Sequence, residues 1–243
     1  SSTLNIATSC GITFCGQSGQ TTTIDTQTEL DNIMGCTDFY GDLILTDQQT
    51  SSTFTNINLP NLQTIEGNLT IQYPNTNISL SNLNQIGADL NMYGYNYCCN
   101  AQNWQGGTNV DSLDFSSLQP VGDITLSTLS YIECLNFDAL KTADAITLHG
   151  GSWSTIYFGI QDLELSTFNN LQNVTRISIQ ATRFGEISGF QNLQTINELV
   201  ISNNNSLTEI SGFDTVSTIN SLSVSSNNSL QICCVLYEIG RAR

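Results

Sequence analysis

Residues 189–207 read GFQNLQTINELVISNNNSL, and residues 212–230 read GFDTVSTINSLSVSSNNSL. The second stretch begins 23 residues after the first, and eleven of its nineteen positions are identical. Both follow one pattern, apolar-x-x-apolar-x-x-apolar-x-x-apolar-x-apolar. The same pattern, in two copies with one extra residue before its last pair, begins seven times along the chain, at Leu59, Leu80, Phe115, Phe137, Phe168, Phe190 and Phe213. The two echoing stretches therefore belong to a repeat that extends over most of the chain.

Each repeat ends in two apolar residues separated by one, which is the alternation of a short β-strand. These endings start at Leu43, Leu69, Leu90, Ile124, Ile146, Ile177, Leu199 and Leu222, the first of them without an upstream half. The triplet spacing before each strand favours a tight or 3₁₀-like segment. One such unit cannot bury its own apolar side chains, whereas stacked units bury them against each other. The sequence therefore predicts an all-β fold with a short cap helix: a β-solenoid of about eight coils over residues 37–230.

The segments outside the repeat differ from it. In residues 1–36 the stretch TQTELDNIMGC predicts a cap helix, with capping-box spacing between Thr26 and Glu29 and an apolar face of Leu30, Ile33 and Met34 that ends at Gly35. Cys36 could pair with Cys10 or with Cys15, locking this N-terminal cap. Residues 231–243 are short and apolar, which fits either a C-terminal cap or an assembly tail.

Two insertions interrupt the repeat, at residues 92–109 and 149–162. The first gathers Tyr95, Tyr97 and Trp104 into a candidate binding loop, which could stack on sugars or contact a partner. The alternative is a loop that packs its own aromatic side chains and is held by disulfides, with Cys134 as one candidate partner.

The net charge is -16, with 21 acidic against 5 basic residues. Such a chain repels nucleic acid and anionic membrane surfaces. No apolar run is long enough to span a membrane. The first residues, SSTLNIATSC, lack the regions of a signal peptide, so we expect a mature or trimmed chain if the protein is secreted.

Cysteines and glycosylation sequons favour an extracellular protein. The eight cysteines form no zinc-binding motif, so we expect disulfides; they are Cys10, Cys15, Cys36, Cys98, Cys99, Cys134, Cys233 and Cys234. Five N-x-S/T sequons begin at Asn68, Asn77, Asn173, Asn204 and Asn227. Asn204 and Asn227 occupy the same place in successive repeats, so we expect their two glycans to stack along one edge.

No catalytic or cofactor motif is found. Carboxylates recur just before the strands, at Asp42, Asp89, Asp123 and Glu198, but whole repeats separate them and no basic residue accompanies them. We therefore expect them to keep the sheet soluble rather than to hydrolyse a glycosidic bond. His149 has no acid–base partner nearby and is expected on the surface. The outward strand positions mix Thr with Ile44, Asn91 and Val200, which does not support a regular threonine array. The sequence predicts no enzyme, no cofactor and no metal site.

With the repeat established, TIDTQTELDNIMGCTDFYGDLILTD, LPNLQTIEGNLTI and GFDTVSTINSLSV together resemble the fungal GPI-anchored cell-wall organisation glycoproteins of the sporulation-specific and extracellular-matrix type. That family is in turn similar to the receptor L-domain, a right-handed solenoid like those of leucine-rich repeats. The resemblance covers roughly residues 20–230. It implies a glycosylated, non-enzymatic surface protein that contributes to wall integrity.

The resulting hypothesis is a secreted structural glycoprotein of a cell surface, wall or extracellular fibre. Its partners would be other wall components, covalent N-glycans, or further copies of itself joined head to tail. The alternative is a receptor L-domain-type module that binds a peptide or a glycan.

Overall fold

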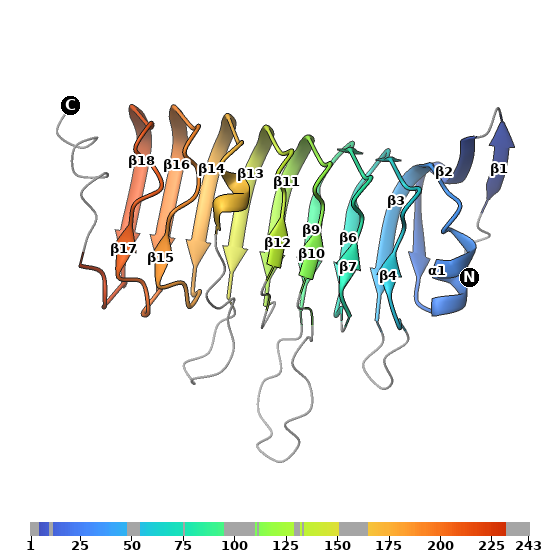
Figure 1. Cartoon of the computed structure of the whole chain (residues 1–243), viewed down its shortest axis with the longest axis horizontal. Helices are drawn as coiled ribbons and strands as arrows, with labels where there is room; N and C mark the ends of the chain where they lie inside the picture. Colours follow the sequence, from blue (N-terminus) through green and yellow to red (C-terminus); the bar gives the residue numbers. More distant parts are fainter. Residues whose placement is uncertain are drawn as a thin grey trace, which may run out of the picture.

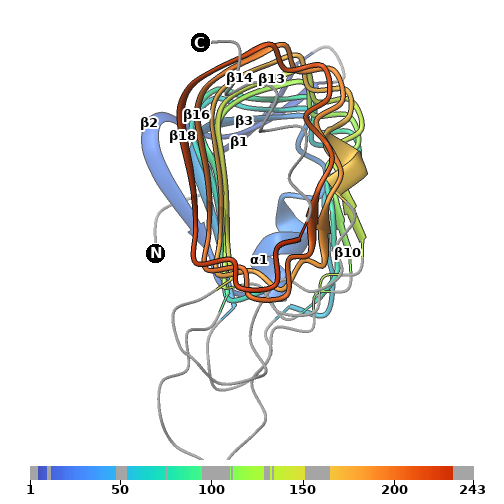
Figure 2. The same ribbon diagram turned by 90° about the vertical axis from the view of Figure 1, so that its left-hand side faces the viewer.

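The computed structural model of the chain describes residues 5–9, 12–47, 54–74, 76–94, 110, 112–128, 132, 134–150 and 165–231. Its strands stack one coil after another along a single axis, with the N-terminal cap at one end (Figure 1). Seen along that axis, the coils superpose around one continuous interior (Figure 2). The predicted right-handed β-solenoid is confirmed.

The largest sheet forms one side of the solenoid. Its strands, in spatial order, are β1 (Ile6–Ser9), β2 (Ile12–Ile24), β3 (Asp38–Thr46), β6 (Leu69–Gln72), β9 (Leu90–Tyr93), β11 (Pro120–Ser127), β13 (Thr142–His149), β14 (Asn173–Gln180), β16 (Thr195–Ser202) and β18 (Thr218–Ser225). Two short strands, β5 (Thr64–Ile65) and β8 (Gln85–Ile86), join it beside β3. All pairings are parallel except β1 with β2.

The strand register follows the repeat. Leu43 pairs with Leu69, Leu69 with Leu90, and so on through Ile124, Ile146, Ile177, Leu199 and Leu222. These are the eight residues at which the sequence predicted the strands to start. Only β6 and β9 begin there, and the other six strands begin four or five residues earlier, because the residues before the apolar pair also join the sheet. The chain makes about seven turns between the first and the last of these eight strands, which agrees with the prediction of about eight coils.

The opposite side of the solenoid carries smaller sheets. One consists of β4 (Ile57–Asn58), β7 (Ile78–Ser79), β10 (Ser112–Asp114) and β12 (Cys134–Asn136), and another of β15 (Glu186–Ile187) and β17 (Glu209–Ile210). Between the two sets, beside the 149–162 insertion, lies the 3₁₀ helix η1 (Leu165–Phe168). Apolar residues of these strands point inward and meet those of the large sheet.

The turn between the two sides explains the triplet spacing. In the first coil the N–H of Leu62 donates to the carbonyl of Leu59 (3.2 Å), and in the last coil Val216 donates to Phe213 in the same way (3.0 Å). A bond between residues three apart closes a single 3₁₀-type turn, which points both apolar side chains inward. The third apolar residue of the triplet, such as Ile65 or Ile196, already belongs to the following strand.

Stacked columns of identical side chains form the core. The clearest column contains five phenylalanines, whose neighbouring ring centroids lie 5.2 to 5.6 Å apart: Phe115, Phe137, Phe168, Phe190 and Phe213. All five are fully buried. Parallel rings at this spacing add to the free energy gained from burial alone.

The N-terminal cap contains the predicted helix, α1 (Gln27–Asn32). Thr26 is its N-cap and accepts from the Glu29 N–H (3.3 Å), while the Glu29 carboxylate accepts from the Asp25 N–H (3.1 Å). The helix stops before Gly35, and its buried face holds Leu30 and Ile33.

The cap differs from the prediction at Met34 and contains a hairpin that was not predicted. Met34 is 39% exposed, because the helix has already ended and the side chain points away from the core. The hairpin of β1 and β2 was not predicted either, since residues 12–24 carry hydroxyls and glycines where a repeat would carry leucines.

Candidate functional site

The outer face of the large sheet is the broadest surface that the repeat builds. Its central column runs from Ile44 through Thr70, Asn91, Thr125, Thr147, Ser178, Val200 and Ser223, one residue from each strand. Ser178 is fully covered, and its hydroxyl accepts from the Gln180 amide (2.7 Å). Six of the eight side chains in this column are therefore small and polar, and two are apolar.

A second outer column holds the predicted acidic residues. It contains Asp42, Asn68, Asp89, Asp123, Ala145, Arg176, Glu198 and Ser221. Successive repeats place their strands next to each other in the sheet, and neighbouring strands lie about 4.8 Å apart. Asp89 and Asp123, which are 34 residues apart in sequence, are therefore immediate neighbours.

These polar side chains connect the coils. Asp42 Oδ1 accepts from the N–H (2.8 Å) and the amide (2.9 Å) of Asn68. Asn68 Oδ1 accepts from the Asp89 N–H (3.1 Å), and Asp89 Oδ1 accepts from the Asp123 N–H (2.9 Å). From β3 to β11, each coil thus uses one side-chain oxygen of the preceding coil as a hydrogen-bond acceptor. Further along the column Arg176 pairs with Glu198 (3.0 Å). The expectation that no basic residue accompanies these carboxylates is therefore wrong, because Arg176 lies next to Glu198 on the adjacent strand.

The two ends of this ladder differ in acidity. Hydrogen bonds to Asp42, first from the Asn68 backbone N–H, hold the pKa of its carboxyl below the ordinary value of 3.8. Desolvation, and then the negative charges of Asp89 and Asp144, raise the pKa of Asp123 above that value. The backbone N–H of Ala145 and the charge of Arg176 act in the opposite direction, but they offset only part of this increase in the Asp123 pKa.

His149 lies on the same outer face, half-buried, as its strand position predicted. Its neighbours on the adjacent strands are Ser127 and Gln180. Neither residue is an acid that would make a catalytic pair with the imidazole.

The five sequon asparagines lie in very different environments. Asn77 and Asn173 are exposed; Asn77 immediately precedes β7, and Asn173 is the first residue of β14. Asn68 is half-buried, and its Nδ2 donates to Asp42. Asn204 is 0% exposed.

Asn204 connects two coils through its whole side chain. Its Oδ1 accepts from the N–H (2.9 Å) and the hydroxyl (2.7 Å) of Thr182, and its Nδ2 donates to the carbonyl of Ile179 (3.0 Å). Asn227 repeats this one coil on: its Oδ1 accepts from the Asn204 N–H (2.9 Å), and its Nδ2 donates to the carbonyl of Ile201 (2.9 Å).

The predicted glycan edge is therefore contradicted at Asn204. An N-glycan attaches through Nδ2, and here that nitrogen is buried and bonded to the preceding coil. The sequence showed that Asn204 and Asn227 occupy the same place in successive repeats, and we interpreted this shared position as a pair of glycosylation sites. The preceding residue, Asn203, has a positive φ (60°) and marks a tight corner of the coil. At this corner the inward amide of Asn204 forms hydrogen bonds with backbone groups of the preceding coil.

Among the cysteines, Cys15 and Cys36 form a disulfide, with Cα atoms 5.9 Å apart. This resolves the two pairings left open for Cys36. Cys134 is exposed and bonds to no other cysteine within the described part of the chain. The predicted disulfide residues Cys10, Cys98, Cys99, Cys233 and Cys234 lie outside the described residues.

The candidate binding loop of Tyr95, Tyr97 and Trp104 also lies outside them, as do most of the second insertion and residues 232–243. Within the described ranges, no group of three or more His, Cys, Asp and Glu side chains is arranged to hold a metal ion. No helix in those ranges is long and apolar enough to cross a membrane.

The fold and these surfaces define the class of protein: a right-handed β-solenoid of about seven turns with a disulfide-closed N-terminal cap. Comparisons with models of protein families, with curated proteins and with solved structures found no match.

Proposed function

We propose that this protein is a non-enzymatic structural glycoprotein of a cell surface, wall or extracellular fibre. Its role is mechanical: it is a stiff rod that assembles with further copies head to tail. The resemblance of its cap and repeats to fungal wall glycoproteins supports this proposal. The Cys15–Cys36 disulfide supports an oxidising, extracellular location.

The observation that carries the proposal is the continuity of the stack. From β3 to β18 each coil is joined to the next by parallel pairing, by a shared core and by side-chain ladders. Two of the acidic side chains that an enzyme would use, Asp42 and Asp89, are engaged in one of these ladders as acceptors for backbone N–H groups of the next coil.

The two ends of the rod differ, and the β18 end supports assembly. At the N-terminal end, a hairpin and α1 cover the first coil (Figure 1). At the other end, β18 pairs with β16 on one side, and within the described residues it has no strand on the other. Its inward side chains Leu222 and Val224 are 44% and 37% exposed, whereas Leu199 and Ile201 of β16 are 0% exposed. An open strand edge with exposed apolar side chains favours association.

The test is the oligomeric state of the whole chain. We expect a mass that grows with concentration in analytical ultracentrifugation, and filaments in electron micrographs. The double substitution Leu222→Lys and Val224→Lys should abolish both, because it places two charges on the proposed contact. Val200→Lys, on the outer face of the neighbouring strand, is the control and should still associate.

Circular dichroism verifies that both variants keep their strands. A native protein that stays monomeric at about 1 mM would overturn the assembly, as would equal association of the edge variant.

The second candidate is a binding module of the receptor L-domain type. The small polar outer face favours it, because an extended peptide or glycan could lie along such a surface. Thr125→Lys with Thr147→Lys would then abolish ligand capture and leave self-association intact. If the protein is only a structural rod, the threonine substitutions should have no effect, and self-association should be lost only when Leu222 and Val224 are substituted.

A further inference from the structure

A second side-chain ladder runs along the 3₁₀-type turns, on the other side of the solenoid from the acidic column. In most coils one side chain at the turn donates to a backbone carbonyl of the preceding coil. Asn82 donates to Pro60 (2.6 Å), Asn170 to Asp138 (2.8 Å) and Thr215 to Gln191 (2.8 Å). Asn61 and Asn192 make equivalent contacts with Met34 and Asn169. We call these contacts the turn clasps.

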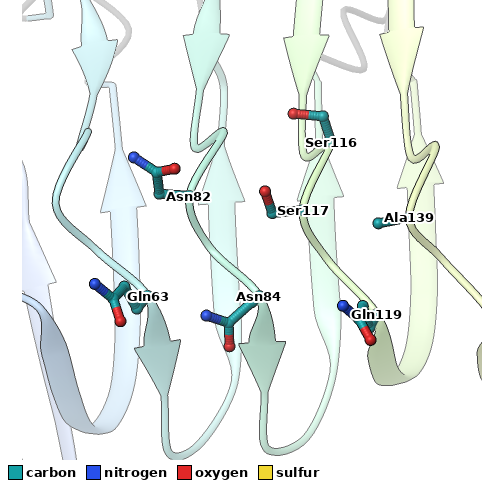
Figure 3. A pocket seen from close by; sticks show the side chains of 7 residues that line it. All are labelled: Gln63, Asn82, Asn84, Ser116, Ser117, Gln119 and Ala139. Carbon is teal, nitrogen blue, oxygen red and sulfur yellow. The ribbon is translucent and has the colours of Figure 1, made fainter.

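The clasps are interrupted at two successive coils. Ser117 and Ala139 occupy the clasp position there, and neither reaches a carbonyl of the preceding coil with its side chain in the described structure. An open hollow of about 390 Å³ lies at this interruption, lined by Gln63, Asn82, Asn84, Ser116, Ser117, Gln119 and Ala139 (Figure 3).

The lower wall of the hollow is a row of three amide side chains. Gln63, Asn84 and Gln119 occupy one position in three successive coils and lie side by side (Figure 3). The backbone holds them in register, because the Asn84 N–H donates to the Gln63 carbonyl (2.9 Å) and the Gln119 N–H to the Asn84 carbonyl (3.2 Å). Their side-chain amides make no hydrogen bond with any residue that the structure describes. Three unengaged amides are thus presented at intervals of about 4.8 Å along the rod.

The chemistry of the lining selects the ligand. In a chain of net charge -16, none of the seven lining residues is charged. Each amide offers two donors and an acceptor, and each serine hydroxyl offers both functions. Such a surface matches a ligand whose groups also donate and accept, as sugar hydroxyls do. The acidity of the whole protein disfavours an anionic chain.

We infer that this hollow binds a neutral glycan chain lying along the solenoid axis across the coils that contain Gln63, Asn84 and Gln119. No aromatic side chain lines it and it is open to solvent, so a single glycan chain binds weakly, with a Kd of about 1 mM. The inference does not depend on the assembly proposed above, since the hollow lies on the flank of the rod and not at its end.

The test uses the whole chain titrated with neutral hexasaccharides, one each of β-1,3-glucose, β-1,4-glucose and mannose units, followed by NMR chemical shifts. A hexagalacturonate serves as the anionic comparator. We expect at least one neutral hexasaccharide to saturate the shifts of Gln63, Asn84 and Gln119, and the comparator to leave them unchanged.

Two sets of substitutions locate the site. Ser117→Asn with Ala139→Asn restores the two clasps and fills the hollow, so it should weaken binding at least tenfold without lowering the melting temperature. Gln63→Ala, Asn84→Ala and Gln119→Ala together should do the same by removing the amides. The matched control is Gln172→Ala with Gln194→Ala, which lie in the same column beyond the hollow and should leave binding unchanged.

Three results would overturn the inference. One is no saturable shift with any neutral hexasaccharide up to 10 mM, on the order of ten times the expected Kd. Another is undiminished binding by the clasp-restored variant. The third is equal loss of binding in the Gln172 and Gln194 control, which would indicate contact with the amide column in general.

Discussion

Asn204 is fully buried, although a polar amide loses its hydrogen bonds to water when it leaves the surface. The fold compensates for this loss with four hydrogen bonds from its side chain, to Thr182, Ile179 and Asn227. Asparagine in this protein therefore has at least two roles that look alike in sequence. Asn204 connects coils from within, whereas Asn77 and Asn173 are exposed on the surface, where Asn77 Oδ1 accepts from the Ser112 N–H (3.1 Å).

Asn204→Ala should destabilise the protein by about 3 kcal/mol, because it leaves the buried Thr182 N–H and Ile179 carbonyl without partners. Ser206→Ala removes the same sequon but leaves Asn204 in place, so its effect should stay within about 0.5 kcal/mol. Urea unfolding followed by circular dichroism measures both.

The second measurement is peptide mapping of the native protein secreted from a glycosylating host, which shows which asparagines carry glycans. We expect unmodified Asn204, and glycans at Asn77 and Asn173. A glycan found on Asn204 of folded protein, or equal destabilisation by the two substitutions, would refute the structural role of this amide.

At the scale of the elements, the strands are the part that the sequence predicted best. All eight strands were identified, because an alternating apolar pair at a fixed place in the repeat has to face the core. Only β6 and β9 begin at the predicted residue, and the other six strands begin four or five residues earlier. The hairpin of β1 and β2 was missed because its residues carry no repeat, although β2 pairs with both β1 and β3. The cap helix was found from its Thr26 and Glu29 signals, but its end was placed too far along the chain.

The acidic column across β3, β6, β9 and β11 gives opposite effects at its two ends. Asp42 has a lowered pKa, so its ionised form stabilises the fold above pH 3.8, and this stabilisation is lost as the pH falls through the lowered value. Asp123 has a raised pKa, so its ionised form destabilises the fold at neutral pH, and protonation relieves that cost as the pH falls.

Asp42→Asn should therefore lower stability at pH 7, and Asp123→Asn should raise it, each by about 0.5 kcal/mol since both groups are partly exposed. Both differences should shrink at pH 3, because protons then bind the Asp123 carboxyl of the folded protein and both carboxyls of the unfolded chain. Urea midpoints of the two variants and the native protein at both pH values measure this. Shifts of the same sign at pH 7 would contradict the assigned causes.

At the scale of the whole molecule, the solenoid is a one-dimensional stack in which each coil contacts its neighbours. Stability then varies along the axis, because an end coil has one neighbour and an inner coil has two. The Cys15–Cys36 disulfide strengthens the N-terminal end. Within the described residues β18 has no comparable reinforcement.

Hydrogen exchange should follow this gradient. Amides of β18 should exchange at least tenfold faster than those of β13, which is paired on both sides. Reducing the disulfide should accelerate exchange in β2 and β3 and leave β18 unchanged. Mass spectrometry of native and reduced protein gives both comparisons, and uniform exchange along the rod would be the contrary result.

By itself, the sequence determined the coil, because the spacing of apolar residues within a repeat is a local property that only stacking can bury. It also predicted a cysteine-closed cap, an acidic column and an outward His149. It did not determine what the polar residues do, since their partners lie one coil away, 21 to 34 residues along the chain.

Only the tertiary structure decided those roles. It paired Cys36 with Cys15, turned Asn204 inward as a connection between coils, and left a hollow where Ser117 and Ala139 interrupt the turn clasps. The physical reason is the same in each case. A polar side chain acts according to the groups that face it, and in a solenoid those groups belong to the neighbouring coil.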